Sequence, residues 1–233
     1  MNIHERTFSI GQVPILAVGG EAPYRGTVLF YHGLGVDKET HRKELYSLAG
    51  QGFLALGIDA VDHGQRTCGY RLERLPMLEA ILESAKEVPM LLEEIQRIQP
   101  DCGNFALVGI SMGGCIAFAA GCNFPKLKAV VPLLSCPNWA EICPDLPDEL
   151  WHESPHLTPE WYNPTALLIQ NAGSDQHVPP QPARDFYEEA KLYYSGVPHL
   201  IEYCEYPNSD HFMEPDEWAQ MWDRTLEWLL EHL

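Results

Sequence analysis

The sequence of 233 residues carries 15 Lys and Arg against 33 Asp and Glu, a formal net charge of −18. An apolar fraction of 45% argues against a disordered or fibrous chain, and this length predicts one domain over residues 1–233 that folds without a metal or disulfide. The acidity argues against nucleic acid and anionic membranes as partners, because both are bound largely through Lys and Arg. Residues 101–233 hold −15 of the charge, which indicates a solvated acidic surface.

Cysteine usage and the first residues bear on the compartment. The seven cysteines are odd in number and no pair has metal-ligand spacing, which favours free thiols in a reducing compartment. The opening MNIHERTFSI lacks the apolar core of a signal peptide, and no apolar stretch reaches the ~18–20 residues that a membrane span needs. We therefore expect a cytoplasmic protein that does not bind membranes, and its oligomeric state stays open.

Apolar runs rich in β-branched residues alternate with helical patterns along the chain. The first two runs predict a hairpin around Gly11-Gln12, and the later alternation predicts βαβ units. In chain order, strands are predicted at 7–10, 13–18, 27–31, 53–58, 105–110, 129–134, 166–170 and 200–206, and helices at 38–49, 72–98, 112–123, 183–194 and 216–232. The helix at 72–98 is expected to kink or split near Pro76 and Pro89. The predicted class is α/β, with a mostly parallel central sheet flanked by helices on both faces.

Two further segments have distinct compositions. In the last predicted helix, apolar side chains recur at helical spacing from Trp218 to Leu229, which predicts packing against the sheet rather than a cofactor site. Residues 137–164 are irregular and rich in proline, and they contain Trp139, Trp151 and Trp161. This segment is too short for a separate domain.

The segment at 109–114, GISMGG, follows an apolar strand and opens an apolar helix. A serine on so tight a strand-to-helix turn has a strained backbone, and Gly109 and Gly113 leave room where a β-carbon would collide. The hydroxyl then stands above the sheet, near a helix N-terminus that favours negative charge. We interpret Ser111 as a nucleophile; the alternative, a serine N-cap after a glycine turn, fits this context less well.

This segment resembles the nucleophile turn of the α/β-hydrolase superfamily, and the resemblance extends over nearly the full chain. It implies an acid after the strand that follows the nucleophile unit, and a histidine after the last strand. Asp175, in GSDQHVP at 173–179, and His211, in DHF at 210–212, occupy these places. The implied catalytic residues are Ser111, Asp175 and His211.

Other histidines and carboxylates are rivals for these roles, namely His63, His177, His199, Asp59, Asp62 and Asp210. His177 and His199 lie before the last predicted strand, and His63 lies before the nucleophile. Asp210 adjoins His211 in sequence, and consecutive side chains seldom face one another. Asp59 and Asp62 also lie before the nucleophile, and we expect them to anchor their loop.

The segment HGLG at 32–35 ends a buried strand before the nucleophile. In the superfamily, the loop at this place supplies one oxyanion-hole N–H and the residue after the serine supplies the other, which implies Leu34 and Met112 as donors. The resemblance then implies that Ser111 attacks an acyl carbonyl, with His211 as the base and Asp175 orienting the imidazole. Neither a metal nor an organic cofactor is needed.

The chain also resembles compact single-domain serine carboxylesterases of the dienelactone-hydrolase-like and prolyl-oligopeptidase-like branch. The segments at 32–35, 59–64 and 109–114 carry this resemblance. Dienelactone hydrolases themselves use cysteine where this chain has Ser111. The implied activity is hydrolysis of small-molecule carboxylic esters with small to medium acyl chains. The alternatives are a thioesterase or other acyl hydrolase with the same triad, and a non-catalytic ligand-binding protein of the same fold.

The superfamily often inserts a lid where residues 137–164 lie. We expect the aromatic side chains of this segment to wall a substrate pocket; the candidate pocket residues are His32, Trp139, Trp151 and Trp161. Its six acidic side chains would face the entrance and favour neutral or cationic esters over anionic ones. The alternative is an acidic surface loop whose tryptophans fill the core.

Overall fold

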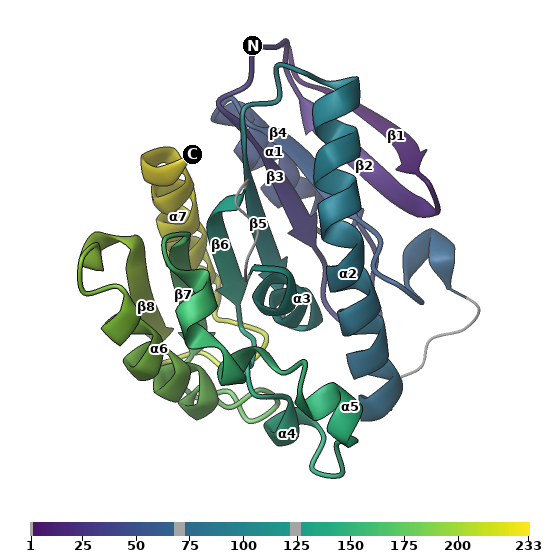
Figure 1. Cartoon of the computed structure of the whole chain (residues 1–233). Helices are drawn as coiled ribbons and strands as arrows, with labels where there is room; N and C mark the ends of the chain where they lie inside the picture. The colour runs from purple at the N-terminus through teal and green to yellow at the C-terminus, as the bar shows by residue number, and fades with distance from the viewer. Residues whose placement is uncertain (1, 68–72, 122–126) are drawn as a thin grey trace.

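The computed structural model describes residues 2–67, 73–121 and 127–233, and within these ranges eight strands form one sheet (Figure 1). The sheet order is β1-β2-β4-β3-β5-β6-β7-β8. The pairs β1–β2 and β2–β4 are antiparallel, and all other neighbours are parallel. The strands are β1 (His4–Ile10), β2 (Val13–Gly19), β3 (Gly26–Tyr31), β4 (Leu54–Ile58), β5 (Asn104–Ile110), β6 (Leu127–Leu133), β7 (Ala166–Ala172) and β8 (Ile201–Tyr206).

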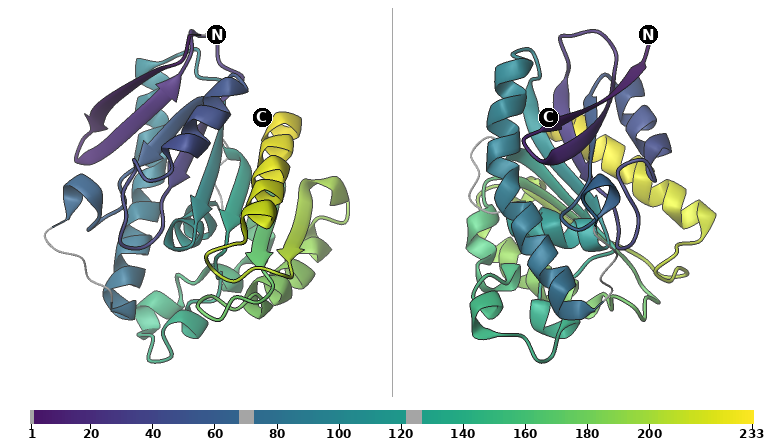
Figure 2. Two further views of the ribbon diagram at one scale, coloured as in Figure 1. Left: turned by 180° about the vertical axis from the view of Figure 1, so that it is seen from behind. Right: turned by 90° about the vertical axis from the view of Figure 1, so that its right-hand side faces the viewer.

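Helices cover both faces of the sheet, so the molecule has three layers (Figure 2). The α-helices are α1 (Arg42–Gly50), α2 (Arg74–Ile98), α3 (Met112–Gly121), α4 (Trp139–Ile142), α5 (Asp148–Trp151), α6 (Gln181–Tyr193) and α7 (Pro215–His232). The 3₁₀ turns are η1 (Gly64–Arg66), η2 (Pro155–Leu157), η3 (Pro159–Tyr162) and η4 (Pro198–Leu200). This arrangement confirms the predicted α/β class and the mostly parallel sheet. Across the described ranges, no helix is both long and apolar enough to cross a membrane.

The central strands are apolar on both sides because helices bury both faces of the sheet. In β3, Leu29 and Tyr31 join the buried cluster formed with α2, α3 and α6, whereas Val28 and Phe30 join the cluster formed with α1 and α7. The side chains that α7 adds to the second cluster include members of the predicted apolar stripe, such as Met221 and Leu229. The stripe therefore packs against the sheet as predicted.

The predicted helix at 38–49 is wrong at its start. α1 begins at Arg42, because the preceding residues form a turn in which the Asp37 carboxylate accepts the N–H of Glu39 at 2.9 Å. Lys38 belongs to this turn and its side chain points into the interior, where it is almost inaccessible to solvent. The helix predicted at 38–49 gave no indication that the charged group of Lys38 is buried.

The helix predicted at 72–98 is one continuous helix over its described part, α2, and it does not split. Pro89 lies inside α2, and Pro76 lies in its first turn, where a helix has no acceptor for the N–H that proline lacks. Residue 72, and residues 122–123 of the next predicted helix, lie outside the described ranges.

Residues 137–164 are held to the body of the molecule by buried side chains. The Trp139 side chain is fully buried, and the Tyr162 hydroxyl donates to the carbonyl oxygen of Phe118 in α3 at 2.7 Å. The Ser154 hydroxyl donates to the carbonyl of Pro137 at 3.2 Å and accepts the N–H of Trp139 at 3.0 Å. The segment therefore forms part of the packed molecule, with Trp139 filling the core.

A buried ion pair joins the loop before α1 to the loop after β4. Lys38 Nζ lies 2.8 Å from Asp59 Oδ2, and both side chains are almost completely inaccessible. The Asp59 carboxylate also accepts the backbone N–H groups of Lys38 and Gln65, each at 2.9 Å. Asp59 thus anchors its loop, as the sequence predicted, and the pairing offsets the cost of burying both charges.

Removing one partner of this pair should be strongly destabilising. We expect Lys38→Met to lower the free energy of unfolding by about 3–5 kcal/mol, because it leaves the Asp59 charge buried without its counter-ion. The matched control is Arg97→Met, which breaks the exposed pair with Glu94 and should leave the free energy of unfolding almost unchanged. Urea unfolding at neutral pH measures both values, and equal losses for the two variants would contradict the prediction.

Candidate active site

Ser111 lies on the turn that joins β5 to α3, in a left-handed backbone conformation with φ of +56°. This turn brings α3 into close contact with the sheet. A β-carbon at Gly109 would lie 2.0 Å from the carbonyl oxygen of Gly113, and one at Gly113 would lie 2.2 Å from the carbonyl oxygen of Tyr31 in β3. Only glycine fits at both positions, so the sequence pattern and the strained serine are parts of one geometry.

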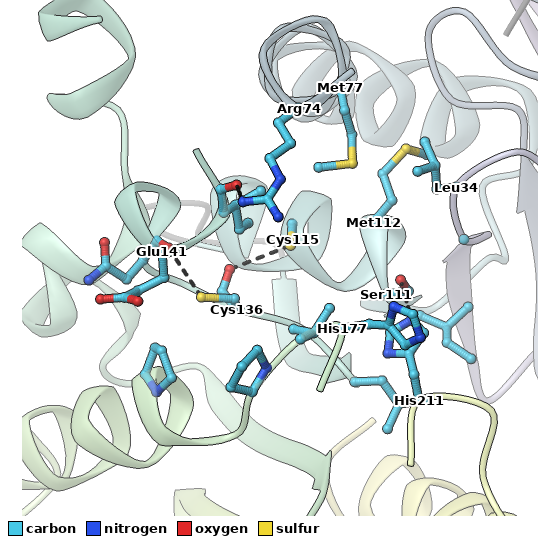
Figure 3. Close-up of a pocket in the computed structure, with 18 of the residues that line it drawn as sticks. Leu34, Arg74, Met77, Ser111, Met112, Cys115, Cys136, Glu141, His177 and His211 are labelled. Atoms are coloured by element: carbon cyan, nitrogen blue, oxygen red, sulfur yellow. Dashed lines mark hydrogen bonds between the residues drawn. The ribbon is translucent and has the colours of Figure 1, made fainter. Parts of the chain in front are cut away.

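Three loops at the carboxyl ends of strands bring Ser111, His211 and Asp175 together. Ser111 Oγ lies 2.9 Å from His211 Nε2, and His211 Nδ1 lies 2.6 Å from Asp175 Oδ2. The serine follows β5, the aspartate follows β7 and the histidine follows β8. Figure 3 shows Ser111 and His211 side by side at one end of the cavity. The three residues predicted from the sequence therefore form one continuous chain of hydrogen bonds.

The Asp175 carboxylate is buried and fully hydrogen-bonded. Its Oδ1 accepts the backbone N–H groups of His177 and Val178, each at 2.8 Å. Burial raises the pKa of Asp175, but the hydrogen bonds from His211, Val178 and His177 outweigh burial and hold this pKa below its usual value. An ionised Asp175 can only accept at Oδ2, so His211 carries its hydrogen on Nδ1 and presents the Nε2 lone pair to Ser111.

The rival residues lie elsewhere or make other contacts. His63 is buried, with Nδ1 at 2.9 Å from the carbonyl oxygen of Val61. His199 lies in η4, which precedes β8, so it is at the amino-terminal end of this strand, whereas the site lies at the carboxyl ends of the strands. Asp210 accepts the N–H of Phe212 at 2.8 Å. His177 is close to the site, because its ring centroid lies 5.8 Å from that of His211.

Leu34 and Met112, the expected oxyanion-hole donors, both line the cavity beside Ser111. The N–H of Met112 occupies the first position of α3, where a helix offers no backbone acceptor. A β-carbon at Gly33 would lie 3.7 Å from Ser111 Cβ, so the loop that carries Leu34 runs next to the serine. Both N–H groups thus belong to backbone that lies next to Ser111.

His32 is wrong as a pocket residue. Its ring is buried beneath the loop, where Nε2 accepts the N–H of Ala60 at 3.2 Å and Nδ1 lies 2.8 Å from the carbonyl oxygen of Gly33. Because Nε2 accepts, Nδ1 carries the hydrogen and donates it. Burial lowers the pKa of His32 to about 4, so the imidazole is neutral near pH 7. His32 ties the Leu34 loop to the loop after β4.

Ser111 opens into a cavity of about 860 Å³. Its walls come from the loop before α1, the start of α2, α3, α4, α6 and the loops after β6, β7 and β8. The tryptophans predicted to line it do not do so, although all three lie in the described ranges: Trp139 is buried in the core, and Trp151 and Trp161 are exposed outside the cavity. Its lining instead includes the apolar and thiol side chains of Met77, Cys115, Cys136, Ile142 and Phe186.

Sequence reasoning missed these five residues. One of them had a signal, because Cys115 follows Ser111 by four residues, in the first turn of α3, and its N–H donates to the carbonyl oxygen of Ser111. The other four come from α2, α4, α6 and the loop after β6, and only tertiary packing brings them together.

Charged groups also line the cavity. Glu141, Asp185 and Glu189 supply three exposed carboxylates. Only Glu141 belongs to the segment predicted to face the entrance; the other two lie on α6. Arg74 supplies one guanidinium, whose Nη1 donates to the carbonyl oxygen of Ile142 at 2.8 Å. Carboxylates therefore outnumber Lys and Arg side chains around the described lining.

The lowered pKa of Asp175 predicts a pH-dependent contribution to stability. A carboxyl whose pKa is lower in the folded state contributes stability above its unfolded pKa of about 3.9, and the contribution is lost as the pH falls through the folded value. We expect the difference in unfolding free energy between wild type and Asp175→Asn to be larger at about pH 7 than at about pH 3. Urea unfolding measures it, with Asp145→Asn on the exposed surface as the control. A difference that does not shrink on acidification would refute the prediction.

Comparison with known proteins places this geometry in a family. Residues 22–141, just over half of the chain, match the family described as serine aminopeptidase, S33. A Bacillus subtilis (strain 168) protein named "Putative esterase YitV" is 29% identical over 208 residues, which cover 79% of this chain and 82% of that protein.

Two solved structures have the same fold. TT1662 from Thermus thermophilus matches with a TM-score of 0.80 and 22% identity over 98% of this chain and 99% of its own. The acylaminoacyl peptidase of Pyrococcus horikoshii matches with a TM-score of 0.80 and 15% identity over 100% of this chain and 42% of its own. At these identities the likeness establishes the fold, which is that of α/β hydrolases. The chain belongs to the S33 serine aminopeptidase family of serine hydrolases.

Proposed function

We propose that this chain is a serine carboxylesterase that hydrolyses carboxylic esters of small to medium acyl chains. The observation that carries the proposal is the continuous hydrogen-bonded chain from Ser111 through His211 to Asp175, at the mouth of a largely apolar cavity. The name of the Bacillus subtilis relative points to ester substrates as well. The same three side chains can hydrolyse thioesters, so a thioesterase is the alternative activity of this site.

The reaction begins when His211 Nε2 takes the proton of Ser111 Oγ as this oxygen attacks the ester carbonyl carbon. The N–H groups of Leu34 and Met112 bind the negative oxygen of the tetrahedral intermediate, and each such donor typically stabilises it by about 2.7–4 kcal/mol. His211 then gives its proton to the departing alcohol oxygen, which leaves an acyl group on Ser111. Asp175 keeps the imidazole in the required tautomer and stabilises the imidazolium.

A water molecule completes the cycle. His211 Nε2 removes a proton from this water as its oxygen attacks the acyl carbonyl, and the second tetrahedral intermediate uses the same two N–H groups. The proton returns to Ser111 Oγ as the carboxylic acid leaves. Every step uses side chains and backbone groups of this chain together with the ester and water.

Removal of the nucleophile tests the proposal directly. We expect wild type to hydrolyse p-nitrophenyl acetate and butyrate, and Ser111→Ala to lower kcat by at least about 10³-fold because no acyl-enzyme can form. Ser195→Ala, an exposed serine after α6, is the matched control and should retain wild-type rates. A fluorophosphonate probe should label wild type and Ser195→Ala but not Ser111→Ala. Absence of both Ser111-dependent hydrolysis and labelling would reject an enzyme and favour a non-catalytic binding protein.

The acidic lining predicts a preference among esters. Three carboxylates around the cavity outweigh its one guanidinium, so they should slow the approach of anionic esters relative to neutral ones. We expect higher kcat/KM for a neutral ester than for an anionic ester of matched size at low salt, and a smaller difference at high salt. Replacement of two lining carboxylates, in Asp185→Asn/Glu189→Gln, should also reduce the difference. Equal kcat/KM values at low salt, or a preference for the anion, would contradict this.

A further inference from the structure

The cavity extends from Ser111 in one main direction. Figure 3 shows Ser111 and His211 at one end, with Cys115, Cys136, Arg74 and Glu141 displaced from them toward α4 and the start of α2. We call this part, lined by Met77, Cys115, Cys136, Ile142 and Phe186, the inner arm. His177 and Phe212 lie beside His211, with ring centroids 5.8 and 5.9 Å from that of His211, and Phe212 is 80% exposed. Cys115, Cys136 and Phe186 of the inner arm are buried, whereas the aromatic ring of Phe212 beside the imidazole is exposed.

The chemistry of the proposed reaction assigns these two sides. His211 must protonate the departing alcohol oxygen, so the alcohol lies on the side of the imidazole. The acyl chain, attached to the same carbonyl carbon, then extends away from His211 into the inner arm. The departing alcohol then lies near the exposed Phe212, whereas the acyl chain packs against the buried Cys115, Cys136 and Phe186.

Cys115 lies nearest to Ser111 along α3 among the residues of the inner arm. Its backbone N–H donates to the carbonyl oxygen of Ser111 at 3.1 Å, so it is one helical turn, about 5.4 Å, further along α3. Its Sγ donates to the carbonyl oxygen of Cys136 at 3.4 Å, and Cys136 Sγ donates to that of Asn138 at 3.1 Å. Burial raises the pKa of Cys115 to about 11 and that of Cys136 further, so both thiols are neutral near pH 7. A buried neutral thiol behaves as a small apolar side chain, which leaves the arm open.

We propose that the inner arm is the acyl-chain site and that the small side chain of Cys115, next to Ser111, allows acyl chains longer than acetyl to enter it. This inference rests on the esterase function proposed above. Each methylene that enters the arm can raise kcat/KM by up to about fourfold, because burying each methylene away from water lowers the free energy of the transition state by a similar amount. The gain ends where a longer chain would meet the polar groups of Arg74 and Glu141. Medium-length acyl chains are therefore preferred over acetyl.

The experiment compares kcat/KM for p-nitrophenyl acetate, butyrate, hexanoate and octanoate in variants of the arm. In Cys115→Phe the phenyl ring occupies the space next to Ser111, and we expect the hexanoate-to-acetate ratio to fall at least tenfold. In Cys115→Ala the arm stays open next to Ser111, and we expect hexanoate to keep its advantage over acetate. Leu192→Phe, which adds the same ring at an exposed position of α6, is the control and should keep the wild-type ratio.

Ile142→Trp narrows the same arm from α4 and serves as a second test if Cys115→Phe does not fold; circular dichroism and thermal unfolding establish folding. A second series, with acetyl fixed and the alcohol lengthened from ethyl to hexyl, separates the two sides of the serine. A hexanoate-to-acetate ratio within twofold of wild type in folded Cys115→Phe and Ile142→Trp would overturn the inference, as would a response confined to the alcohol series. If the ratio is unchanged but wild type still hydrolyses acetate through Ser111, the inference fails and the esterase function stands. If wild type shows no Ser111-dependent acetate hydrolysis, both the function and the inference are rejected.

Discussion

The close approach of α3 to the sheet is the constraint on which the rest of the site depends. Gly109 and Gly113 leave no room for a β-carbon, and Ser111 between them adopts a left-handed backbone conformation. The surrounding structure must supply the stability that this strain costs. It does so through strands buried on both faces, since β3 and β5 lie side by side at the centre of the sheet under two helical layers.

The parallel sheet converts this strained turn into a site. Because neighbouring parallel strands end at the same edge, the loops after β5, β7 and β8 lie together even though their residues are far apart in sequence. Hydrogen bonds at Asp175 then determine which donor binds each carboxylate oxygen. Two backbone N–H groups donate to Oδ1, which leaves Oδ2 for His211. The orientation of the histidine follows from that distribution.

Two buried polar contacts hold in place the loop before α1, which carries Leu34. The Lys38–Asp59 pair joins the loop before α1 to the loop after β4, and His32 bonds to both loops through its two ring nitrogens. The side chains of His32, Lys38 and Asp59 do not line the cavity. They position the backbone that carries Leu34. His32, which the sequence predicted to line the pocket, therefore supports this backbone from below instead. The neutral state of His32 fits this role, because a charged imidazole could not accept the N–H of Ala60.

The sequence by itself determined the order of strands and helices, the glycine turn at Ser111 and the positions of Asp175 and His211. These are local patterns or places relative to a strand end, and a parallel sheet brings strand ends together whatever the details of packing. The tertiary structure alone decided which residues line the cavity. Met77, Ile142 and Phe186 come from three different helices, and their meeting depends on how those helices pack. Composition misassigned Trp139 to the pocket for the same reason, because a large aromatic side chain fills a core as readily as it lines a cavity.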